Sequence, residues 1–464
     1  MGLFRNIVRG IVSFIPEVET PKMKVPLRSK LLWSGIVLIL YFILTEIPLY
    51  GVAPSRYDRL ATFRIIFAGS QGSIVELGIG PIVTAGIILE LLVGSKIIPL
   101  DLTDPDDRSF FQASQKLASI LFIVVTAALY VAGGQYGVLD RRTSFLVWLQ
   151  LAAGCFILMY LDEVSSKWGI ASGISLFILA GIAQTVFWAA FSPFTAPDVD
   201  RVVGAIPALL TEGAMAITRG GLPDIAKLTA TFIVFVAVAV AYDVKIVFPL
   251  SFARIGGYKA SYPLRLLYVS NIPIIFTSAL FGDIAIVSQT LWSRFGYSDN
   301  EYLRMLVRII GEYQYVEGNL VPKGGLAYYT QPPYGMLSFS ADPLRAAIYG
   351  IILIILCVVF SVIWVLTSGM DADSVADQLV SQELVMPGMR VSRKIIANRL
   401  RRYINSVTLL GGLFIGVIAL LADLTGALGS GSGILLGVTI TYSIYESLMK
   451  ERLLEIYPIA KRFL

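Results

Sequence analysis

Residues 77–88 read Leu-Gly-Ile-Gly-Pro-Ile-Val-Thr-Ala-Gly-Ile-Ile, an apolar run with glycine and proline near its start. Proline lacks a backbone N–H and is tolerated only in the first turn of a helix, so Gly78-Ile79-Gly80-Pro81 interrupts any helix that contains it. A later apolar run carries a similar break at Asn271-Ile272-Pro273. Such breaks at matching positions indicate helices that line a functional path in a membrane protein, although proline kinks can also serve packing alone.

The composition around these runs is that of a membrane protein. Of the 464 residues, 56% are hydrophobic and only 15% are charged, whereas a soluble domain carries about 25% charged residues. A membrane-spanning helix needs about 20 mostly apolar residues. The second and tenth of the predicted spans are rich in glycine and are the weakest by hydropathy. Ten spans are predicted, at 32–49, 74–93, 117–138, 144–161, 171–191, 228–244, 266–289, 346–366, 404–422 and 431–449.

Several classes of chemistry are excluded by residue type. The chain has no histidine, which rules out a Ser-His-Asp triad and any histidine-ligated metal within it. Cys155 and Cys357 both lie inside apolar runs and are expected to be buried hydrophobic side chains. The sequence has no glycine-rich phosphate loop, so any energy source must lie outside the chain. We therefore expect that the protein holds no cofactor or metal and is not an enzyme.

The distribution of basic residues predicts the orientation. With both termini inside, the inner segments carry 24 of the 37 Lys and Arg and the outer segments carry 13. We therefore expect a multi-pass protein of the cell membrane with both termini in the cytoplasm. The first 15 residues are predicted to form an amphipathic helix in the membrane surface. The large inner loops 245–265 and 367–402 are basic, and 192–227 and 293–345 are the large outer connections.

Ten spans divide into two sets of five, and an odd number per half requires the halves to be inverted relative to each other. The predicted units are 1–191, an outer connection 192–227, and 228–464. The fifth and tenth spans open alike, with Ser172-Gly173-Ile174 and Ser432-Gly433-Ile434. The second, fifth, seventh and tenth spans would then line the path, and an apolar ring there can seal a pore by contact and dewetting. The apolar candidates are Ile79, Val83, Ile174, Ile178, Ile275 and Leu436.

Acidic residues keep two other functions open. Glu90 and Asp283 lie within spans, whereas others near span ends are expected at solvated positions: Asp162, Asp243, Asp423 and Glu446. A secondary transporter of a small solute would need polar groups at the midplane, and the apolar lining argues against it. An intramembrane hydrolase would need a second aspartate facing Asp283, and no motif supplies one.

Several motifs resemble those of the SecY family, the central subunits of the protein-conducting translocon. Residues 77–88 are similar to its second-helix signature, and Tyr268–Pro273 to its seventh-helix motif. Further similarities, some closest to archaeal members, lie at 160–163, 169–174, 16–19 and 399–404. The resemblance implies an all-α polytopic fold with ten transmembrane helices in two inverted five-helix halves, arranged as a clamshell. It also implies a SecE-type (gamma) subunit and a small beta-type subunit as partners.

The resemblance further implies roles for particular residues. The constriction ring falls on the six apolar residues named above. Residues 59–71 match the plug, a mildly amphipathic helix and hinge, although an ordinary outer loop is the alternative; its apolar positions are Leu60, Phe63, Ile66 and Phe67. Thr84, Gln115 and Asn271 match a polar cluster in the lateral gate, where packing amides are the alternative. Basic residues of the inner loops would dock a ribosome or motor, unless they only follow the topology rule: Arg254, Arg390, Arg393 and Lys394.

These inferences together predict a protein-conducting channel. It would translocate unfolded secretory polypeptides across the membrane and release transmembrane segments sideways into the lipid bilayer. A translating ribosome or another cytoplasmic driver would supply the force. Its expected partners include nascent secretory and membrane polypeptides, but not DNA.

Overall fold

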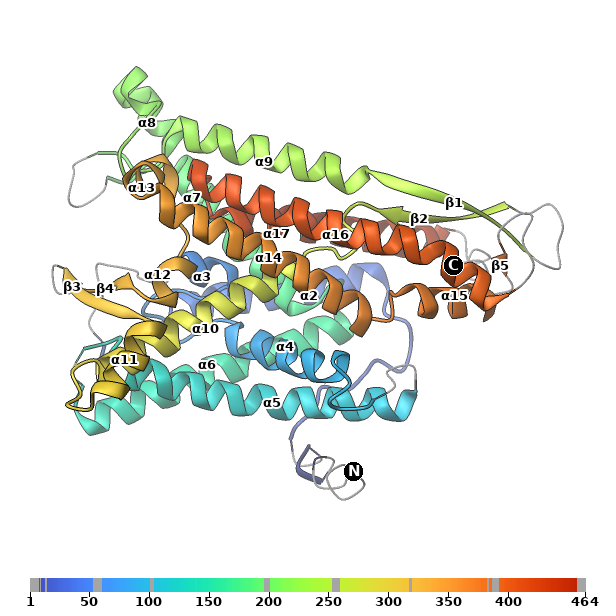
Figure 1. Ribbon diagram of the computed structural model, residues 1–464, viewed down its shortest axis with the longest axis horizontal. Coiled ribbons are helices and arrows are strands. Elements are labelled where there is room, and N and C mark those ends of the chain that lie inside the picture. The colour runs from blue at the N-terminus through green and yellow to red at the C-terminus, as the bar shows by residue number, and fades with distance from the viewer. Residues whose placement is uncertain are drawn as a thin grey trace.

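Long helices run roughly side by side along the longest axis of the molecule (Figure 1). The computed structural model describes residues 8, 10–12, 15–52, 61–100, 104–137, 139–195, 201–252, 259–316, 319–381, 384–385 and 392–456. The ten principal helices are α2 (Leu27–Glu46), α4 (Gly80–Gly94), α5 (Pro105–Ala132), α6 (Arg141–Trp168), α7 (Gly173–Phe191), α9 (Ile225–Asp243), α10 (Ile272–Phe295), α14 (Pro343–Thr367), α16 (Arg393–Thr425) and α17 (Gly431–Ile456).

Short elements occupy the connections at the two ends of these helices. At one end, which we call the cap side, lie α8 (Ala205–Glu212), η1 (Gly213–Ala216), α11 (Glu301–Ile310), β3 (Glu312–Val316), β4 (Asn319–Gly324), α12 (Leu326–Thr330) and α13 (Gly335–Ala341). At the other end, the basic-loop side, lie β1 (Lys245–Phe252), β2 (Lys259–Arg265), α15 (Ala372–Ser381) and β5 (Leu384–Val385). A further short helix, α3 (Ala61–Ile66), lies in the interior between the long helices.

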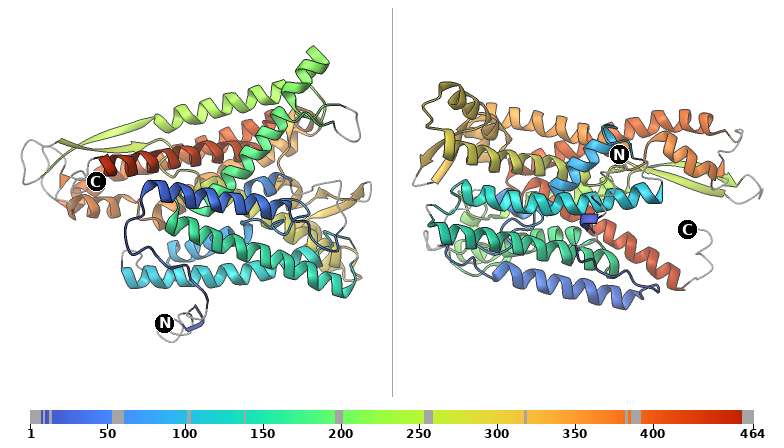
Figure 2. Two further views of the ribbon diagram at one scale, coloured as in Figure 1. Left: turned by 180° about the vertical axis from the view of Figure 1, so that it is seen from behind. Right: turned by 90° about the horizontal axis from the view of Figure 1, so that it is seen from below.

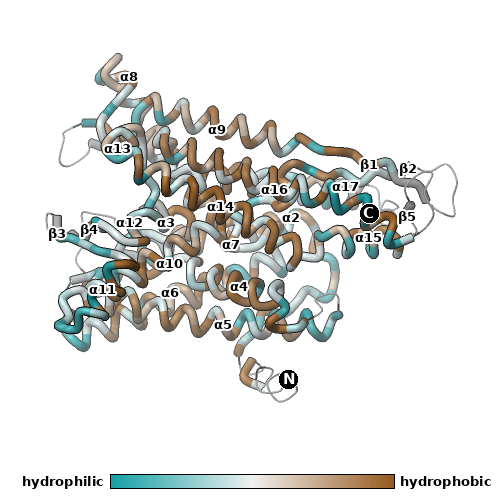
Figure 3. The backbone as a smooth tube through the Cα atoms, in the orientation of Figure 1, coloured by the Kyte–Doolittle hydropathy of each residue, from teal (hydrophilic) through white to brown (hydrophobic). Residues whose placement is uncertain are grey.

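Hydrophobic residues concentrate along the central lengths of the long helices, and hydrophilic ones gather toward both ends (Figure 3). This is the pattern expected of helices that cross a bilayer. From behind and from below, α2, α6 and α7 pack together, and α17 lies against α9 (Figure 2). One large buried cluster extends through both groups and forms the core.

Each of the ten predicted spans overlaps one of the ten principal helices. In the described part of the chain, eight helices are long and apolar enough to cross a membrane by length and composition. The other two are α4, which has only 15 residues, and α17, in which glycine, serine, threonine and tyrosine dilute the apolar residues. They correspond to the two spans with the weakest predicted hydropathy.

The predicted interruptions prove to be helix starts. Residues 74–79 form turns, and α4 begins only at Gly80; residues 266–271 also form turns, and α10 begins at Ile272. The parts of the predicted spans that precede the breaks, 74–79 and 266–271, are therefore not helical. The physical reason is the proline in the first turn of each helix, where its missing N–H leaves no bond unmade.

The two starts share the same local geometry. Gly78 and Ser270 have positive φ angles of 57° and 55°, and the N-cap residues Ile79 and Asn271 have φ of −90° and −95°. At Gly78 a Cβ atom would also lie 2.0 Å from the carbonyl oxygen of Phe67, so glycine is required there. The matched geometry supports a structural repeat between the two halves.

A second matched feature joins α6 to α7 and α16 to α17. Asp162 Oδ1, near the end of α6, accepts a hydrogen bond from Ile174 N at 2.9 Å. Asp423 Oδ1, near the end of α16, likewise accepts one from Gly431 N at 2.7 Å. Asp423 is 2% exposed and also bonds Tyr349, so its expected solvated position was wrong. Its carboxylate instead satisfies an N–H at the start of the next helix.

The capping serines define the register of this repeat. Ser172 Oγ accepts a hydrogen bond from Ser175 N, and Ser430 Oγ accepts one from Gly433 N. The counterpart of Ser172 is therefore Ser430. The three-residue sequence match, which pairs Ser172 with Ser432, is two residues out of register.

The basic loops carry a small sheet. Antiparallel pairing joins β1 to β2, with Lys245 opposite Arg265, and joins β1 to β5. A separate cluster of buried hydrophobic residues packs this sheet and α15 against the first turns of α16. Of the predicted N-terminal amphipathic helix, residues 8 and 10–12 are helical and residue 15 is in a bend; its other residues lie outside the described residues.

Candidate pore, plug and lateral gate

The chain between α2 and α4 folds back into the centre of the helix bundle. After α3 the backbone reverses, and Ile79 N donates a hydrogen bond to Phe67 O at 2.8 Å. Tyr41 of α2 donates its hydroxyl to Ala68 O at 3.1 Å in a fully buried position. These bonds hold the end of α3 beside the start of α4, at the junction of the two halves.

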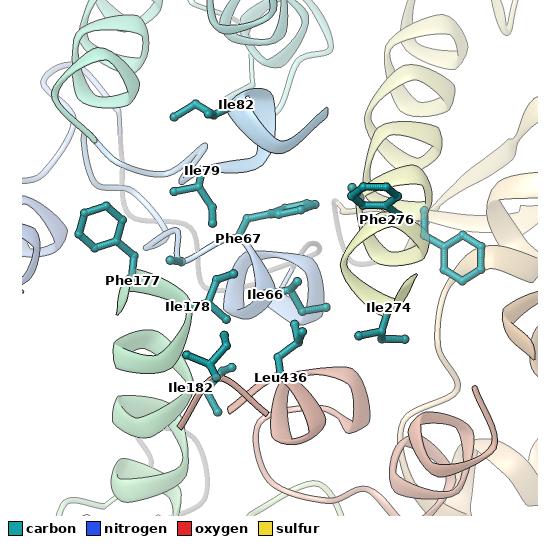
Figure 4. Close-up of a cluster of buried hydrophobic side chains, with 14 of the residues drawn as sticks. Ile66, Phe67, Ile79, Ile82, Phe177, Ile178, Ile182, Ile274, Phe276 and Leu436 are labelled. Atoms are coloured by element: carbon teal, nitrogen blue, oxygen red, sulfur yellow. The ribbon is translucent and has the colours of Figure 1, made fainter. Parts of the chain in front are cut away.

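Three predicted ring residues meet the end of α3. They are Ile79, the N-cap residue of α4, Ile178 of α7 and Leu436 of α17, and each is at most 1% exposed. Figure 4 shows their side chains directed toward Ile66 and Phe67, which lie between them. The structure thus brings together residues from both halves around two predicted plug residues. The contact is wholly apolar, and dispersion and water exclusion favour it.

The other three predicted ring residues are only partly buried against the same core: Val83, Ile174 and Ile275. Val83 follows Ile79 by one turn of α4, and Ile174 precedes Ile178 by one turn of α7. Given the directions of these helices, both lie one turn closer to the basic-loop side. The ring residues level with α3 are therefore covered, and those displaced toward the basic loops remain half-exposed.

A buried ion pair holds the α3 segment in its folded-back form. Arg64 Nη1 lies 3.0 Å from Glu76 Oε1, and the two side chains are only 5% and 3% exposed. Glu76 Oε2 also accepts hydrogen bonds from the Tyr136 hydroxyl and from Gly72 N, each at 3.0 Å. Removing one partner from such a buried pair costs far more than removing an exposed one, because a charge is left in the interior. The pair thus joins α3 to the segment 69–79 that returns from α3 to α4, here called the return segment, and Tyr136 links both to the end of α5.

The return segment also docks against neighbouring helices. Leu49 N donates to Gly72 O at 2.8 Å and Ile74 N to Ile47 O at 3.0 Å, so the segment forms a short antiparallel bridge with the residues that follow α2. On α6, a Cβ atom at Gly154 would lie 1.9 Å from the Ile74 carbonyl oxygen. Glycine at this position is therefore required for the close approach of the segment to α6.

Of the four predicted apolar plug positions, Ile66 and Phe67 are buried, at 2% and 8% exposed. Phe63 belongs to α3, but only the backbone of this residue is described. Leu60 lies outside the described residues. Sequence reasoning missed Arg64, Glu76 and Tyr136. A signal was present, since arginine and glutamate flank the hinge, but their pairing depends on the fold.

Polar contacts cross the seam between α4–α5 and α10. Thr84 Oγ1 on α4 donates a hydrogen bond to Asp283 Oδ2 on α10 at 2.9 Å. Toward the cap side, Gln289 Nε2 donates to Gln135 Oε1 at 3.0 Å. Asp283 therefore faces a threonine hydroxyl across the seam. Further along α4, one carboxylate oxygen of Glu90 is buried without a hydrogen-bond partner in the described part of the chain.

The predicted polar cluster is only partly assembled. Gln115, on α5, faces Gly86 of α4, so its amide lies within the first half. Asn271 is the N-cap residue of α10 and accepts a hydrogen bond from the Ser270 hydroxyl. Thr84 thus lies at the seam, but the structure pairs it with Asp283 and not with the two predicted amides.

The basic residues predicted to dock a ribosome or motor lie at the start of α16 or outside the described residues. Arg393 forms an exposed ion pair with Asp377 at 2.6 Å, and Lys394 is exposed. Arg254 and Arg390 lie outside the described residues. No group of three or more acidic or cysteine side chains that could hold a metal occurs within the described ranges.

Comparisons with known proteins agree with this architecture. The SecY family model matches residues 73–445, and a model described as the plug domain of Sec61p matches residues 39–72. The protein translocase subunit SecY of Pyrococcus furiosus is 41% identical over 475 residues, covering 99% of this chain and 98% of the relative. The Sec61 subunit alpha of Dictyostelium discoideum is 38% identical, with 97% of each chain covered.

Solved structures give the same result. A structure described as that of a protein conducting channel has a TM-score of 0.81 and 40% identity, covering 97% of this chain and 98% of the other. Sec61 in the canine ribosome–channel complex from the endoplasmic reticulum has a TM-score of 0.78 and 39% identity, with the same coverage. The ten-helix clamshell with two inverted halves is thereby confirmed, and the chain belongs to the SecY family.

Proposed function

We propose that this chain is a channel that passes unfolded secretory polypeptides across a membrane and releases transmembrane segments sideways into lipid. One observation carries the proposal. Apolar side chains from α4, α7 and α17, which belong to different halves, converge on the buried α3 segment and close the centre of the bundle. A small-solute transporter would require a polar midplane site, and family membership favours the channel over that alternative.

The ring provides the seal and the α3 segment completes it. Ile79, Val83, Ile174, Ile178, Ile275 and Leu436 form a ring that excludes water when it is closed. Residues 59–71 act as the plug and leave the ring when an extended polypeptide enters. The ring then closes on the polypeptide by apolar contacts, which adapt to any passing side chain because they are non-directional.

The seam between α4–α5 and α10–α14 is the lateral gate. Thr84 contributes a hydrogen bond across it, and Gln115 and Asn271 flank it on either side. Hydrogen bonds between membrane helices are worth only about 0.6 kcal/mol on average, so such a seam can open reversibly. A sufficiently apolar segment leaves the pore through this seam because the transfer of its apolar side chains from water to lipid is favourable.

Both termini and the basic loops face the cytoplasm of a cell whose plasma membrane holds the channel. The excess of Lys and Arg in the inner segments supports this orientation. Arg254, Arg390, Arg393 and Lys394 dock a ribosome or another cytoplasmic driver; the related canine Sec61 structure is a ribosome–channel complex. A SecE-type subunit and a small beta-type subunit complete the assembly. The outer connection 192–227 joins the two halves, 1–191 and 228–464.

A disulfide across the gate tests this function. An ideal Cβ built on Gly94 of α4 lies 3.5 Å from the Cβ of Thr367 on α14. Disulfides need a Cβ–Cβ separation of roughly 3.5–4.5 Å, so Gly94→Cys with Thr367→Cys can close without backbone movement. Full-length chain with its small subunits, reconstituted in vesicles, is supplied with ribosomes translating a secretory precursor. Protease protection of the precursor and alkali-resistant insertion of a membrane protein are measured.

We expect the oxidised double variant to lose membrane insertion and precursor protection, and both to return after reduction. Each single-cysteine variant, oxidised in parallel, should behave as the parent. Normal insertion with a quantitatively formed disulfide would contradict the gate assignment. Absence of protection in the parent, despite bound ribosomes, would contradict the channel function itself.

A further inference from the structure

The cap-side helix α11 (Glu301–Ile310) has a strongly two-sided sequence. Its charged residues, Glu301, Arg304 and Arg308, are spaced so that they share one stripe of the helix. Apolar residues and a tyrosine occupy the remaining positions. This pattern is typical of a helix that lies in a surface between water and an apolar phase.

Only one edge of the apolar face of α11 packs on the protein. Val307 is 3% exposed and belongs to a small buried cluster that includes Trp292 and Tyr313. The rest of the apolar face is strongly exposed. Four residues at spacings i, i+3, i+4 and i+7 form this exposed face, with exposed fractions of 84, 63, 60 and 59%: Tyr302, Met305, Leu306 and Ile309.

The position of α11 in the chain places it at the membrane surface. It follows the spanning helix α10 after five residues, 296–300, and lies at the cap-side end of that helix (Figure 1). Asn300 accepts hydrogen bonds from Tyr302 N and Leu303 N, which fixes the start of the helix. Phe295, the last residue of α10, is 38% exposed, and Tyr297 is 76% exposed. Aromatic residues at such a level mark the boundary between lipid and water.

Continuity with the lipid-facing surface of α10 identifies what covers the exposed face. Leu280, Val287 and Phe295 are exposed along α10, within a segment that crosses the bilayer. We propose that α11 lies in the surface of the lipid bilayer on the cap side. Tyr302, Met305, Leu306 and Ile309, here called the α11 apolar face, enter the boundary of the acyl chains. Arg304 and Arg308 remain at the level of the lipid phosphates, which arginine binds well.

This contact has a mechanical consequence for the gate. α10 forms one side of the seam with α4 and α5 and carries Asp283. An interfacial helix rigidly joined to its end resists tilting of α10, because tilting would lift the apolar face from the lipid. The composition of the cap-side leaflet would therefore influence gate opening. The placement itself rests on the membrane embedding of the chain and does not require the channel activity.

Lipid-quenching of a fluorescent label tests the placement. Cys155 and Cys357 are buried, so a cysteine introduced on the surface can be labelled selectively with the environment-sensitive dye NBD. Leu306→Cys is compared with Arg308→Cys, which lies on the polar stripe of the same helix and is also exposed. The full-length chain with its small subunits is reconstituted in phosphatidylcholine vesicles that contain some phosphatidylglycerol. The quencher is a phosphatidylcholine with a nitroxide high on its acyl chain.

We expect the label at Leu306 to emit at shorter wavelength and to be quenched about twofold more than the label at Arg308. Ile309→Cys and Arg304→Cys should reproduce the difference. Equal quenching within both pairs, with emission typical of water, would overturn the proposal. A blue-shifted label at Leu306 that ignores nitroxide lipid but is quenched by nitroxide-labelled copies of the chain would also overturn it, because a second copy would then cover the face. Neither readout depends on translocation, so failure of the channel function is distinguishable.

Discussion

Replacing Glu76 by glutamine removes the carboxylate that faces Arg64 inside the α3 segment and leaves the guanidinium in a site that is 5% exposed. Removing one partner of a buried ion pair costs about 3–5 kcal/mol. When the plug leaves the ring, Arg64 reaches water and this cost disappears. At 1.4 kcal/mol for each factor of ten, the ratio of unseated to seated plug should rise by a factor of about 10² to 4 × 10³. The glutamine has nearly the same volume, so packing does not account for the change.

The assay is the ion conductance of the channel complex in planar bilayers without a translocating polypeptide. We expect frequent openings with Glu76→Gln and rarer ones with Tyr136→Phe, which removes one hydrogen bond to a charged group, worth about 1.5–3 kcal/mol. The matched control is the double variant Arg64→Met with Glu76→Gln, which removes both charges and should remain largely closed. Parent-like conductance with Glu76→Gln alone would refute the view that this pair holds the plug in place.

Three further predictions concern the seat, the ring and the gate. Gly154→Ala should make vesicles that contain the channel leak ions, because the new Cβ would lie 1.9 Å from a backbone oxygen of the plug-bearing segment. Gly35→Ala, where a Cβ would meet nothing within 4 Å, should cause no leak. Equal leak from the two variants would contradict the role of Gly154 in seating this segment. Leu436→Asn should weaken the seal and allow export of precursors with defective signal sequences; unchanged leak and unchanged selectivity would count against its place in the ring. Asp283→Ala should lower the hydrophobicity needed for membrane insertion, since it removes the bond to Thr84 across the seam; an unchanged insertion threshold in a series of model segments would contradict this.

Much of the architecture follows from local sequence. Apolar runs of bilayer length give the spans, and proline in a first turn marks where α4 and α10 begin. Ile79, Ile178 and Leu436 could be selected because they lie on the interrupted or matched spans, and the structure brings them together. These features depend on residues close together in the chain, where spacing alone is informative.

The pairings could not be predicted, because they depend on which helices become neighbours. Asp423 resembles a solvated residue at a helix end, yet the fold turns it toward Gly431 and buries it. Asp283 has no partner in its own span and accepts a hydrogen bond from Thr84, which lies 199 residues earlier in the chain. The ion pair of Arg64 exists only because the chain reverses after α3. Each of these contacts joins segments whose approach is set by tertiary packing.

In a channel of this kind the polypeptide passes through the apolar ring, and site-specific crosslinking tests this most directly. A single cysteine replaces Ile178 in a chain that lacks Cys155 and Cys357, and ribosomes are stalled on secretory chains with one cysteine at successive distances from the ribosome. The control is a cysteine at Phe187, which is 65% exposed on the same helix. We predict a disulfide with position 178 over a narrow window of distances and none with position 187. Silence at position 178 at every distance, with ribosomes shown to be bound, would contradict the account.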